Sequence, residues 1–311
     1  MQAPVLHAFA AGLASALFAL AATIGTPGAI IFAYLTQLPL FAVGLGHSAG
    51  MLAISGAVAA ALLIVLESGL FAVIFLVINV LPAYWLSRLA LLSRPLPEGG
   101  VGWYPPGLLV TWLTGMAVAG LVTAYVAFSG AEGGLPGTVE RFLRAGLALM
   151  VGGSESQIER AVGAVAPLFP SIVLVSWMVM VVVNGALAQG ALVRFGYNRR
   201  PTPRVSDIEL PRWALAPVAA ALALSILGGG VASHFGSNLS LVLCLPFFFV
   251  GLAVVHAYAR RRPLRWVILV GTYAAVMVFG WPAMALVVLG FVEQWAGIRR
   301  RLGEPPSAEK E

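Results

Sequence analysis

The chain has 311 residues, of which 60% are hydrophobic and only 10% are charged, and its formal net charge is +6. Soluble globular domains carry about a quarter charged residues, so this composition excludes a soluble domain. The length accommodates at most about a dozen helical spans of about 20 apolar residues each and leaves no room for a sizeable domain outside the membrane. The single cysteine, Cys244, excludes an intrachain disulfide, and the single aspartate, Asp207, excludes a paired-aspartate metal site.

Ten apolar segments bounded by Gly, Pro or charged residues predict membrane spans. They lie at about residues 5–24, 27–45, 49–66, 69–87, 107–128, 169–193, 213–234, 238–258, 264–279 and 282–296. The last two are short and are separated by Gly280-Trp281-Pro282, so they are either two tilted spans or a re-entrant pair. The expected fold is an all-α polytopic transmembrane helical bundle of about 8–10 spans, with residues 1–302 forming a single transmembrane domain.

The basic residues are distributed unevenly between the two sides of the membrane. In a ten-span topology, fifteen of the eighteen Lys and Arg residues fall on one side of the membrane. The other side has only Arg141, Arg144 and Arg160. By the positive-inside rule, this asymmetry predicts a multi-pass membrane protein with both termini in the cytoplasm. The positive net charge therefore indicates membrane orientation and not nucleic-acid binding.

The long external loop, about 129–168, is expected to contain two interfacial helices. Apolar residues recur at helical spacing from Val139 to Met150, and Ser154-x-x-Gln157 is a capping box that predicts the start of a second helix. These helices form a lid over an external cavity, or they lie on the membrane surface. The polar, proline-containing stretch 303–311 is expected to be a disordered cytoplasmic tail.

Five residues inside or beside the spans are candidate substrate-binding residues. Four are amide residues, whose polar side chains are costly in a membrane and need a partner there, and the fifth is a glycine in a flexible run. They are Gln37, Asn79, Asn184, Asn238 and Gly229. Gln37 and Asn79 each precede a proline, which frees a backbone carbonyl one helical turn back and creates a polar niche. A substrate can bind in such a niche, or a side chain of the protein itself can fill it.

Two further features leave alternatives open. Gly229 is the centre of a Gly228-Gly229-Gly230 run that faces outside in this topology, where it lets the backbone approach a ligand closely or simply forms a helix end with a tight turn. Glu293, in the last apolar segment, is either a proton-coupling carboxylate or the partner of Arg299 in a salt bridge.

Templates of known enzymes do not match the sequence. It contains no H-E-x-x-H, no P-loop and no G-x-S-x-G motif, and its four histidines fall on different spans. We therefore expect a protein that is not an enzyme and that has no catalytic residues, no metal site and no cofactor.

Residues 38–45 and 245–252 are identical at six of eight positions, which indicates a parallel internal repeat or chance similarity in a restricted alphabet. The first of these segments also contributes to a resemblance to a known family. Tyr34–Phe41, Trp103-Tyr104-Pro105, Gly236–His256 and Gln294-Trp295 with Arg299-Arg300-Arg301 resemble the YybS-like family of predicted multispanning bacterial membrane proteins, a domain of unknown function. The resemblance covers most of the chain.

That family is distantly similar to the substrate-capture subunits (S components) of energy-coupling-factor vitamin transporters. The resemblance implies a small-molecule site in an outward-open cavity and a small-residue face on the first helix that docks a membrane coupling subunit. On this chain the corresponding partner-helix face is formed by Ala10, Ala14, Gly12 and Ala16. The same small residues also suit packing within the chain, and S components typically have six spans.

The leading hypothesis is an integral inner-membrane protein, a transporter-like or small-molecule-capturing bundle that opens outward around the second, fourth, sixth, seventh and eighth spans. Its expected partners are the lipid bilayer, a small-molecule substrate and a membrane coupling subunit, and not nucleic acid. The alternative is a non-transporting scaffold or regulatory protein that binds partner proteins through its Ala-rich first helix and basic loops. An enzyme that acts on lipid is a third hypothesis.

Overall fold

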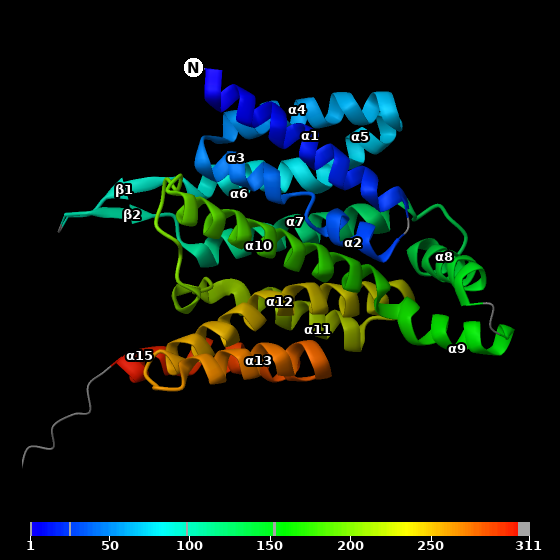
Figure 1. The fold of residues 1–311 in the computed structure, drawn as a ribbon. Helices are drawn as coiled ribbons and strands as arrows, with labels where there is room; N and C mark the ends of the chain where they lie inside the picture. Colours follow the sequence, from blue (N-terminus) through cyan, green and yellow to red (C-terminus); the bar gives the residue numbers. More distant parts are fainter. Residues whose placement is uncertain (1, 25, 98, 152–153, 304–311) are drawn as a thin grey trace, which may run out of the picture. The chain divides into compact units, whose positions relative to one another are not determined.

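The structure is a computed structural model that describes residues 2–24, 26–97, 99–151 and 154–303 (Figure 1). Within these ranges nearly all elements are helices. The strands β1 (Ser93–Pro95) and β2 (Val101–Trp103) form one antiparallel hairpin in which Ser93 lies opposite Trp103. The predicted all-α class is confirmed.

The α-helices of the described residues range from 6 residues in α15 to 30 residues in α12. In chain order they are α1 (Gln2–Ile24), α2 (Pro27–Tyr34), α3 (Leu38–Gly46), α4 (Ala49–Leu66), α5 (Gly69–Phe75), a π-helical segment (Leu76–Val80), α6 (Leu81–Ala90), α7 (Pro106–Ala127), α8 (Gly134–Val151), α9 (Glu155–Val165), α10 (Phe169–Phe195), α11 (Leu215–Leu227), α12 (Gly230–Ala259), α13 (Arg265–Phe279), α14 (Pro282–Ala296) and α15 (Ile298–Gly303). Single 3-10 turns lie at Ala166–Leu168, Val205–Asp207 and Arg212–Ala214.

Seven helical stretches of the described residues are long and apolar enough to cross a membrane. They are Ala3–Ile24, Gly28–Gly46, Ala49–Leu66, Gly69–Ala90, Pro106–Ala127, Glu155–Phe195 and Gly230–Ala259. Three shorter apolar helices account for the remaining predicted segments, at Arg212–Leu227, Arg265–Phe279 and Pro282–Ala296. The polytopic architecture is therefore confirmed.

The chain divides into two compact units. Unit 1 consists of the chain up to Leu113 together with Trp177–Pro203, and unit 2 consists of Thr114–Ser176 and the chain from Arg204 onward. Helices α7 and α10 contribute residues to both units. The units are described separately below.

In unit 1, α1 packs on α4 (Figure 1), and small residues of α1 lie at this contact. A Cβ atom at Gly12 would lie only 2.5 Å from the carbonyl oxygen of Ser55, so the two backbones approach too closely for any side chain at this position. Ala16 is fully buried, Ala14 is half-buried and Ala10 is exposed. Packing within the chain therefore occupies Gly12 and Ala16 of the predicted partner-helix face.

In unit 2, α12 is the central helix and packs against α11 and α14. A Cβ atom at Gly251 would overlap the backbone of Leu286, and one at Gly290 would overlap the backbone of Phe247. The two glycines thus form a close crossing of α12 and α14, the type of contact that small residues allow between membrane helices.

The long loop between α7 and α10 contains the two predicted helices, α8 and α9. The predicted capping box begins α9, where the backbone N–H of Ser154 donates to Oε1 of Gln157 at 3.0 Å. Val139 of α8 and Val162 of α9 belong to one buried cluster, against which Tyr125 of α7 packs. Both helices are thus anchored to unit 2 by an apolar core of their own.

The boundary between the seventh and eighth apolar segments differs from the prediction. The sequence pattern placed it after residue 234, whereas α11 ends at Leu227 and α12 begins at Gly230. Gly230 has a φ of +51°, a conformation that favours glycine, and Gly236 lies against the backbone of α11. The predicted tail lies outside the described residues, apart from Gly303 at the end of α15.

Candidate intramembrane binding site

The second apolar stretch is interrupted in its middle, between α2 and α3. Helix α2 ends at Tyr34, and α3 begins at Leu38 with Pro39 in its first turn. Side chains from two other helices bind carbonyl groups at the break: Oγ of Ser15 on α1 donates to the Thr36 carbonyl at 2.6 Å, and Nδ2 of Asn184 on α10 donates to the Tyr34 carbonyl at 2.7 Å. The break is therefore held by side-chain hydrogen bonds in the interior of unit 1.

A second interruption lies in the fourth apolar stretch, at the π-helical segment Leu76–Val80. Pro82 follows it and has no N–H, so the Ile78 carbonyl lacks its usual partner four residues on. This carbonyl instead accepts two side-chain hydrogen bonds, both 3.0 Å long, from Nε2 of Gln37 and from Nε1 of Trp177 on α10. The freed carbonyl predicted from the proline thus exists, and side chains of the protein occupy it.

Two amide oxygens remain without a partner at these interruptions. Oε1 of Gln37 and Oδ1 of Asn184 are buried and accept no hydrogen bond from any described residue. The Gln37 side chain is 0% exposed, and Asn184 is 1% exposed. The amide orientations are fixed by their nitrogen atoms, because each nitrogen donates to a backbone carbonyl: Gln37 to Ile78, and Asn184 to Tyr34 and Met180.

Such unpaired oxygens are energetically unfavourable. A buried acceptor without a donor costs about 1–3 kcal/mol, and native structures rarely retain one without a reason. A ligand that satisfies these oxygens must supply N–H or O–H donors or positive charge, because amide oxygens are acceptors only. No group of three or more His, Cys, Asp or Glu side chains that could hold a metal ion is found in the described part of the chain.

Asn79 lies next to Ile78 in the π-helical segment, and its side chain is half-buried. Three of the five predicted site residues, Gln37, Asn79 and Asn184, therefore belong to unit 1, on or beside the two interruptions. π-Helical segments inside α-helices are frequent at functional sites. We take Gln37, Asn184 and the Tyr34 and Ile78 carbonyls as the intramembrane site.

Asn238 and Gly229 belong to unit 2 and have local structural roles. Oδ1 of Asn238 accepts from the backbone N–H of Ser171 at 2.9 Å, and Nδ2 donates to the carbonyls of Pro167 and His234. Asn238 thus joins the start of α10 to α12 with both of its amide atoms bonded. Gly229 is the N-cap residue of α12, as expected for a tight turn between two helices.

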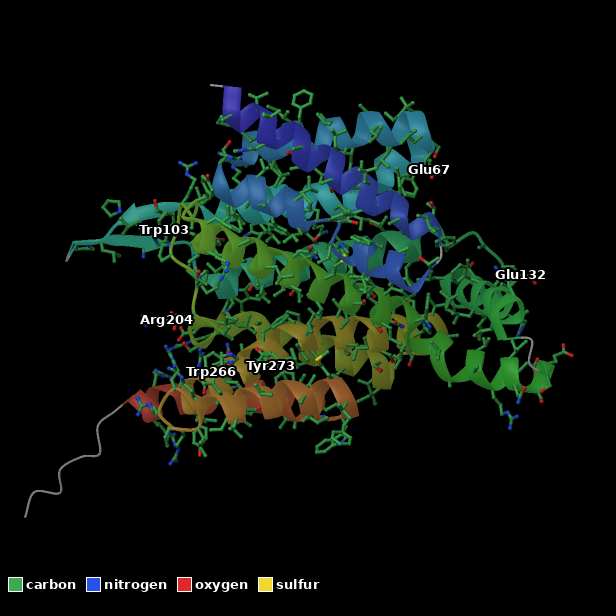
Figure 2. All side chains as sticks on the ribbon, viewed as in Figure 1. Glu67, Trp103, Glu132, Arg204, Trp266 and Tyr273 are labelled. Carbon is green, nitrogen blue, oxygen red and sulfur yellow. The ribbon has the colours of Figure 1, made fainter. Side chains whose placement is uncertain are left out.

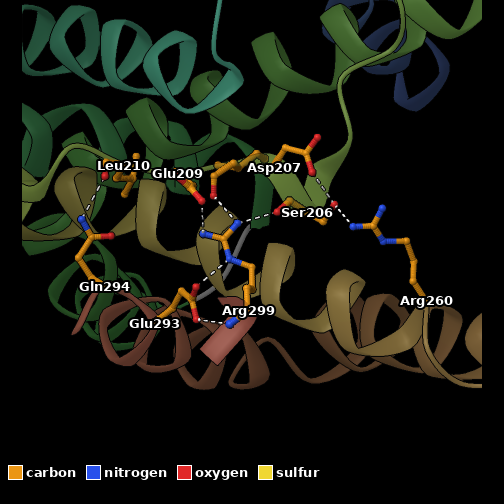
Figure 3. A network of polar contacts seen from close by, with 9 residues as sticks. Ser206, Asp207, Glu209, Leu210, Arg260, Glu293, Gln294 and Arg299 are labelled. Atoms are coloured by element: carbon orange, nitrogen blue, oxygen red, sulfur yellow. Dashed lines mark hydrogen bonds and ion pairs between the residues drawn. The ribbon is translucent and has the colours of Figure 1, made fainter. Parts of the chain in front are cut away.

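Glu293 lies in a polar network at the end of unit 2 (Figure 3). Its Oε1 accepts from Nε of Arg299 at 2.8 Å, and its Oε2 accepts from the Arg299 backbone N–H. The same guanidinium group donates to the carbonyls of Ser206 and Ile208. This geometry matches the salt-bridge alternative for Glu293, and the network attaches the 204–212 loop to α14 and α15.

Sequence reasoning did not identify Trp177 or Ser15 as hydrogen-bond donors to the carbonyls at the two interruptions. A tryptophan in an apolar span looks like one more hydrophobic residue, although its indole N–H needs an acceptor once buried. Ser15 lies among alanines and is compatible with any small-residue face. The partners of both residues depend on packing between helices far apart in the sequence.

Comparison with known proteins gives a family but no function. No curated protein and no solved structure shows significant similarity to the chain. One family model, described as a predicted membrane protein (DUF2232), matches residues 12–293. The match includes every residue of the intramembrane site and covers most of the chain, so the protein belongs to this family of predicted membrane proteins.

Proposed function

We propose that the protein is a transporter-like membrane protein, not an enzyme, which captures a small solute at the intramembrane site of unit 1. The observation that carries this proposal is the pair of buried, unpartnered oxygens of Gln37 and Asn184. They lie where two apolar stretches are interrupted, and broken membrane helices commonly form substrate sites in transporters. The solute is a cation or a molecule with N–H or O–H donors, because the site offers acceptors only.

The proposed setting is the bacterial inner membrane, with both termini in the cytoplasm. The charge asymmetry supports it, since the exposed Arg88, Arg94 and Arg199 lie between apolar segments, at ends that share one side of the membrane in a ten-span topology. The similarity to S components and the docking of a coupling subunit stay predictions, and Ala10 and Ala14 are the part of the first-helix face that packing leaves accessible.

The test is native mass spectrometry of the purified protein in lipid nanodiscs. The wild-type protein is expected to retain a non-lipid solute, and Gln37→Met is expected to lose it because methionine removes Oε1 while keeping the approximate volume of the side chain. Trp177→Phe is the matched control. It also deletes one donor to the Ile78 carbonyl, but it leaves both unpartnered oxygens in place.

Retention of the solute by Trp177→Phe and its loss from Gln37→Met would support solute capture at this site. Equal loss in both variants would show that the Ile78 hydrogen bonds matter only for folding. A wild-type protein that carries only lipid or a protein partner would favour the scaffold hypothesis.

A further inference from the structure

Unit 1 contains a cavity at the end of its helices that the proposed function does not use. Its volume is about 380 Å³, within the range of small-molecule sites. It is lined by Ser48, Ala49, Arg88, Leu91, Leu92, Ser93, Trp103 and Arg199. Figure 2 labels Trp103, which ends β2 at the base of the hairpin. None of these residues belongs to the intramembrane site.

The cavity is positively charged and has no counterion among the described residues. Arg88 and Arg199 both line it, and neither forms an ion pair with a described carboxylate. The only described acidic residue of unit 1, Glu67, caps the far end of α4, about 27 Å away along an 18-residue helix. Two arginines that share a cavity without a carboxylate attract an anion.

Backbone groups add to this positive potential. The cavity includes Ser48 and Ala49, the N-cap and first residue of α4. Oγ of Ser48 accepts from the N–H of Met51, whereas the N–H groups of Ala49 and Gly50 donate to no described acceptor. A Cβ atom at Gly50 would meet nothing closer than 3.7 Å, so a ligand can approach this turn. Unpaired N–H groups at a helix N-terminus favour phosphate.

Arg199 is held in place by the opposite end of a neighbouring helix. Its guanidinium group donates to the carbonyl of His47, the C-cap residue of α3. The guanidinium carbon of the buried Arg200 lies 5.7 Å from the centroid of the ring of Trp103, which lines the cavity. Arg199 is thus positioned before any ligand binds, and Arg200 places a third positive charge near the cavity.

We propose that this cavity binds a phosphate ester: Arg88, Arg199 and the first turn of α4 contact the phosphate, and Leu91, Leu92 and Trp103 contact its organic part. Fork-shaped guanidinium groups match phosphate oxygens, and the volume exceeds what inorganic phosphate alone requires. The ester comes from a phospholipid headgroup or from a soluble molecule, and both supply the same chemistry. The site is independent of the proposed transport function.

Two measurements on the full-length protein test this proposal. Glycerol 3-phosphate is titrated into protein in dodecyl maltoside micelles, which contain no phosphate ester, with glycerol as the ligand control. Native mass spectrometry then counts phosphatidylglycerol molecules retained after release from mixed phosphatidylglycerol and phosphatidylcholine nanodiscs. Arg88→Gln is the test variant, because Arg88 is exposed and donates to no described residue, and Arg194→Gln is the control because it removes the same charge from the exposed last turn of α10, outside the cavity.

Tight binding of glycerol 3-phosphate would identify a soluble ester, and retention of phosphatidylglycerol without it would identify a lipid headgroup. In either case, Arg88→Gln is expected to weaken binding about tenfold or more, the effect of losing one charge-assisted contact. Arg194→Gln is expected to leave it within about twofold. The proposal is overturned if the wild type binds neither ligand, or if the two variants behave alike.

Discussion

The carbonyl oxygen of Ile78 accepts two side-chain hydrogen bonds where an α-helix would offer it one backbone N–H. Side-chain donors replace the backbone N–H here because Pro82 has no N–H to donate. Trp177 alone satisfies this carbonyl, so the hydrogen bond from Gln37 adds a second donor while placing Oε1 in the interior without a partner. The arrangement has an energetic cost that a bound solute would offset.

This cost leads to a prediction for Gln37→Met. The variant loses one hydrogen bond, worth about 0.5–1.5 kcal/mol, and also loses an unpaired acceptor that costs about 1–3 kcal/mol. The two terms nearly cancel or favour the variant, so we expect its free energy of unfolding, measured without added solute in a mild detergent, to lie between about 0.5 kcal/mol below and about 2.5 kcal/mol above that of wild type. A loss above about 3 kcal/mol would mean that Oε1 has a partner in the folded protein.

A second residue-scale prediction concerns His47, which lies in the turn between α3 and α4, outside the spans. Burial, followed by the nearby charges of His7 and Arg199, lowers the pKa of His47 from its ordinary value of 6.5. The folded state therefore takes up this proton at a lower pH than the unfolded state. Stability falls as the pH drops below about 6.5, because unfolding then binds more protons.

Thermal unfolding at pH 7.5 and pH 5.5 tests whether stability falls as the pH drops. The Tm of His47→Gln is expected to fall less between the two pH values than that of the wild-type protein, since glutamine at this position cannot be protonated. His47 is hydrogen-bonded to His7 at 3.0 Å, so the difference reports the titration of His47 together with its effect on His7. An equal loss of Tm in both proteins would contradict the lowered pKa.

At the scale of elements, glycines determine how closely the helices of unit 2 pack. Gly290 of α14 faces the backbone of Phe247, whereas Gly271 of α13 has open space where a Cβ atom would lie. We expect Gly290→Ala to destabilise the protein by about 1–3 kcal/mol or more through overpacking. Gly271→Ala is expected to be neutral or stabilising by up to about 1 kcal/mol.

Chemical unfolding of the two variants, compared with wild type, measures this contrast. Both substitutions add one methyl group to a helical glycine of an apolar segment, so helix propensity and hydropathy change alike. Equal stabilities would show that α12 and α14 are not in backbone contact at this crossing.

The elements themselves could largely be predicted from the sequence. Hydropathy identified all ten apolar segments, and the Ser154-x-x-Gln157 pattern placed the start of α9 because a capping box is local chemistry. The break at Gly228–Gly229 was misplaced, since the polar residues that follow it satisfy one another within unit 2 and let α12 begin eight residues early. The two segments of the candidate repeat also occupy different positions in their helices. Residues 38–45 begin α3, whereas residues 245–252 lie inside α12.

The candidate site could be predicted only in part. Pro39 and Pro82 indicated freed carbonyls, which is a local consequence of proline. The groups that reach the carbonyl freed by Pro82 and the Tyr34 carbonyl at the other break come from α10, whose Trp177 and Asn184 are 99 and 150 residues from their acceptors in the chain. No local pattern encodes such contacts, and none could show that Gln37 and Asn184 keep an unpaired oxygen.

At the scale of the whole molecule, the orientation in the membrane is the property that connects the two proposed sites to their compartments. In the proposed topology, Glu67 and Glu132 face outside, and Arg94 and Arg204 face the cytoplasm. All four are exposed, and Cys244 is the chain's single cysteine, so a Cys244→Ala background allows labelling at one position at a time.

A membrane-impermeant maleimide applied to intact cells is expected to label Glu67→Cys and Glu132→Cys. It is expected to label Arg94→Cys and Arg204→Cys only after the cells are opened. The opposite pattern would invert the topology and would place the arginine-lined cavity outside the cell.

The central claim is that the oxygens of Gln37 and Asn184 are unpaired within the protein because a solute pairs with them. An experimental structure of the lipid-embedded protein, at a resolution that shows ordered water, tests this claim most directly. The account predicts density that does not belong to the chain within hydrogen-bonding distance of Oε1 of Gln37 or Oδ1 of Asn184. Protein N–H or O–H donors on both oxygens, with no such density, would contradict it.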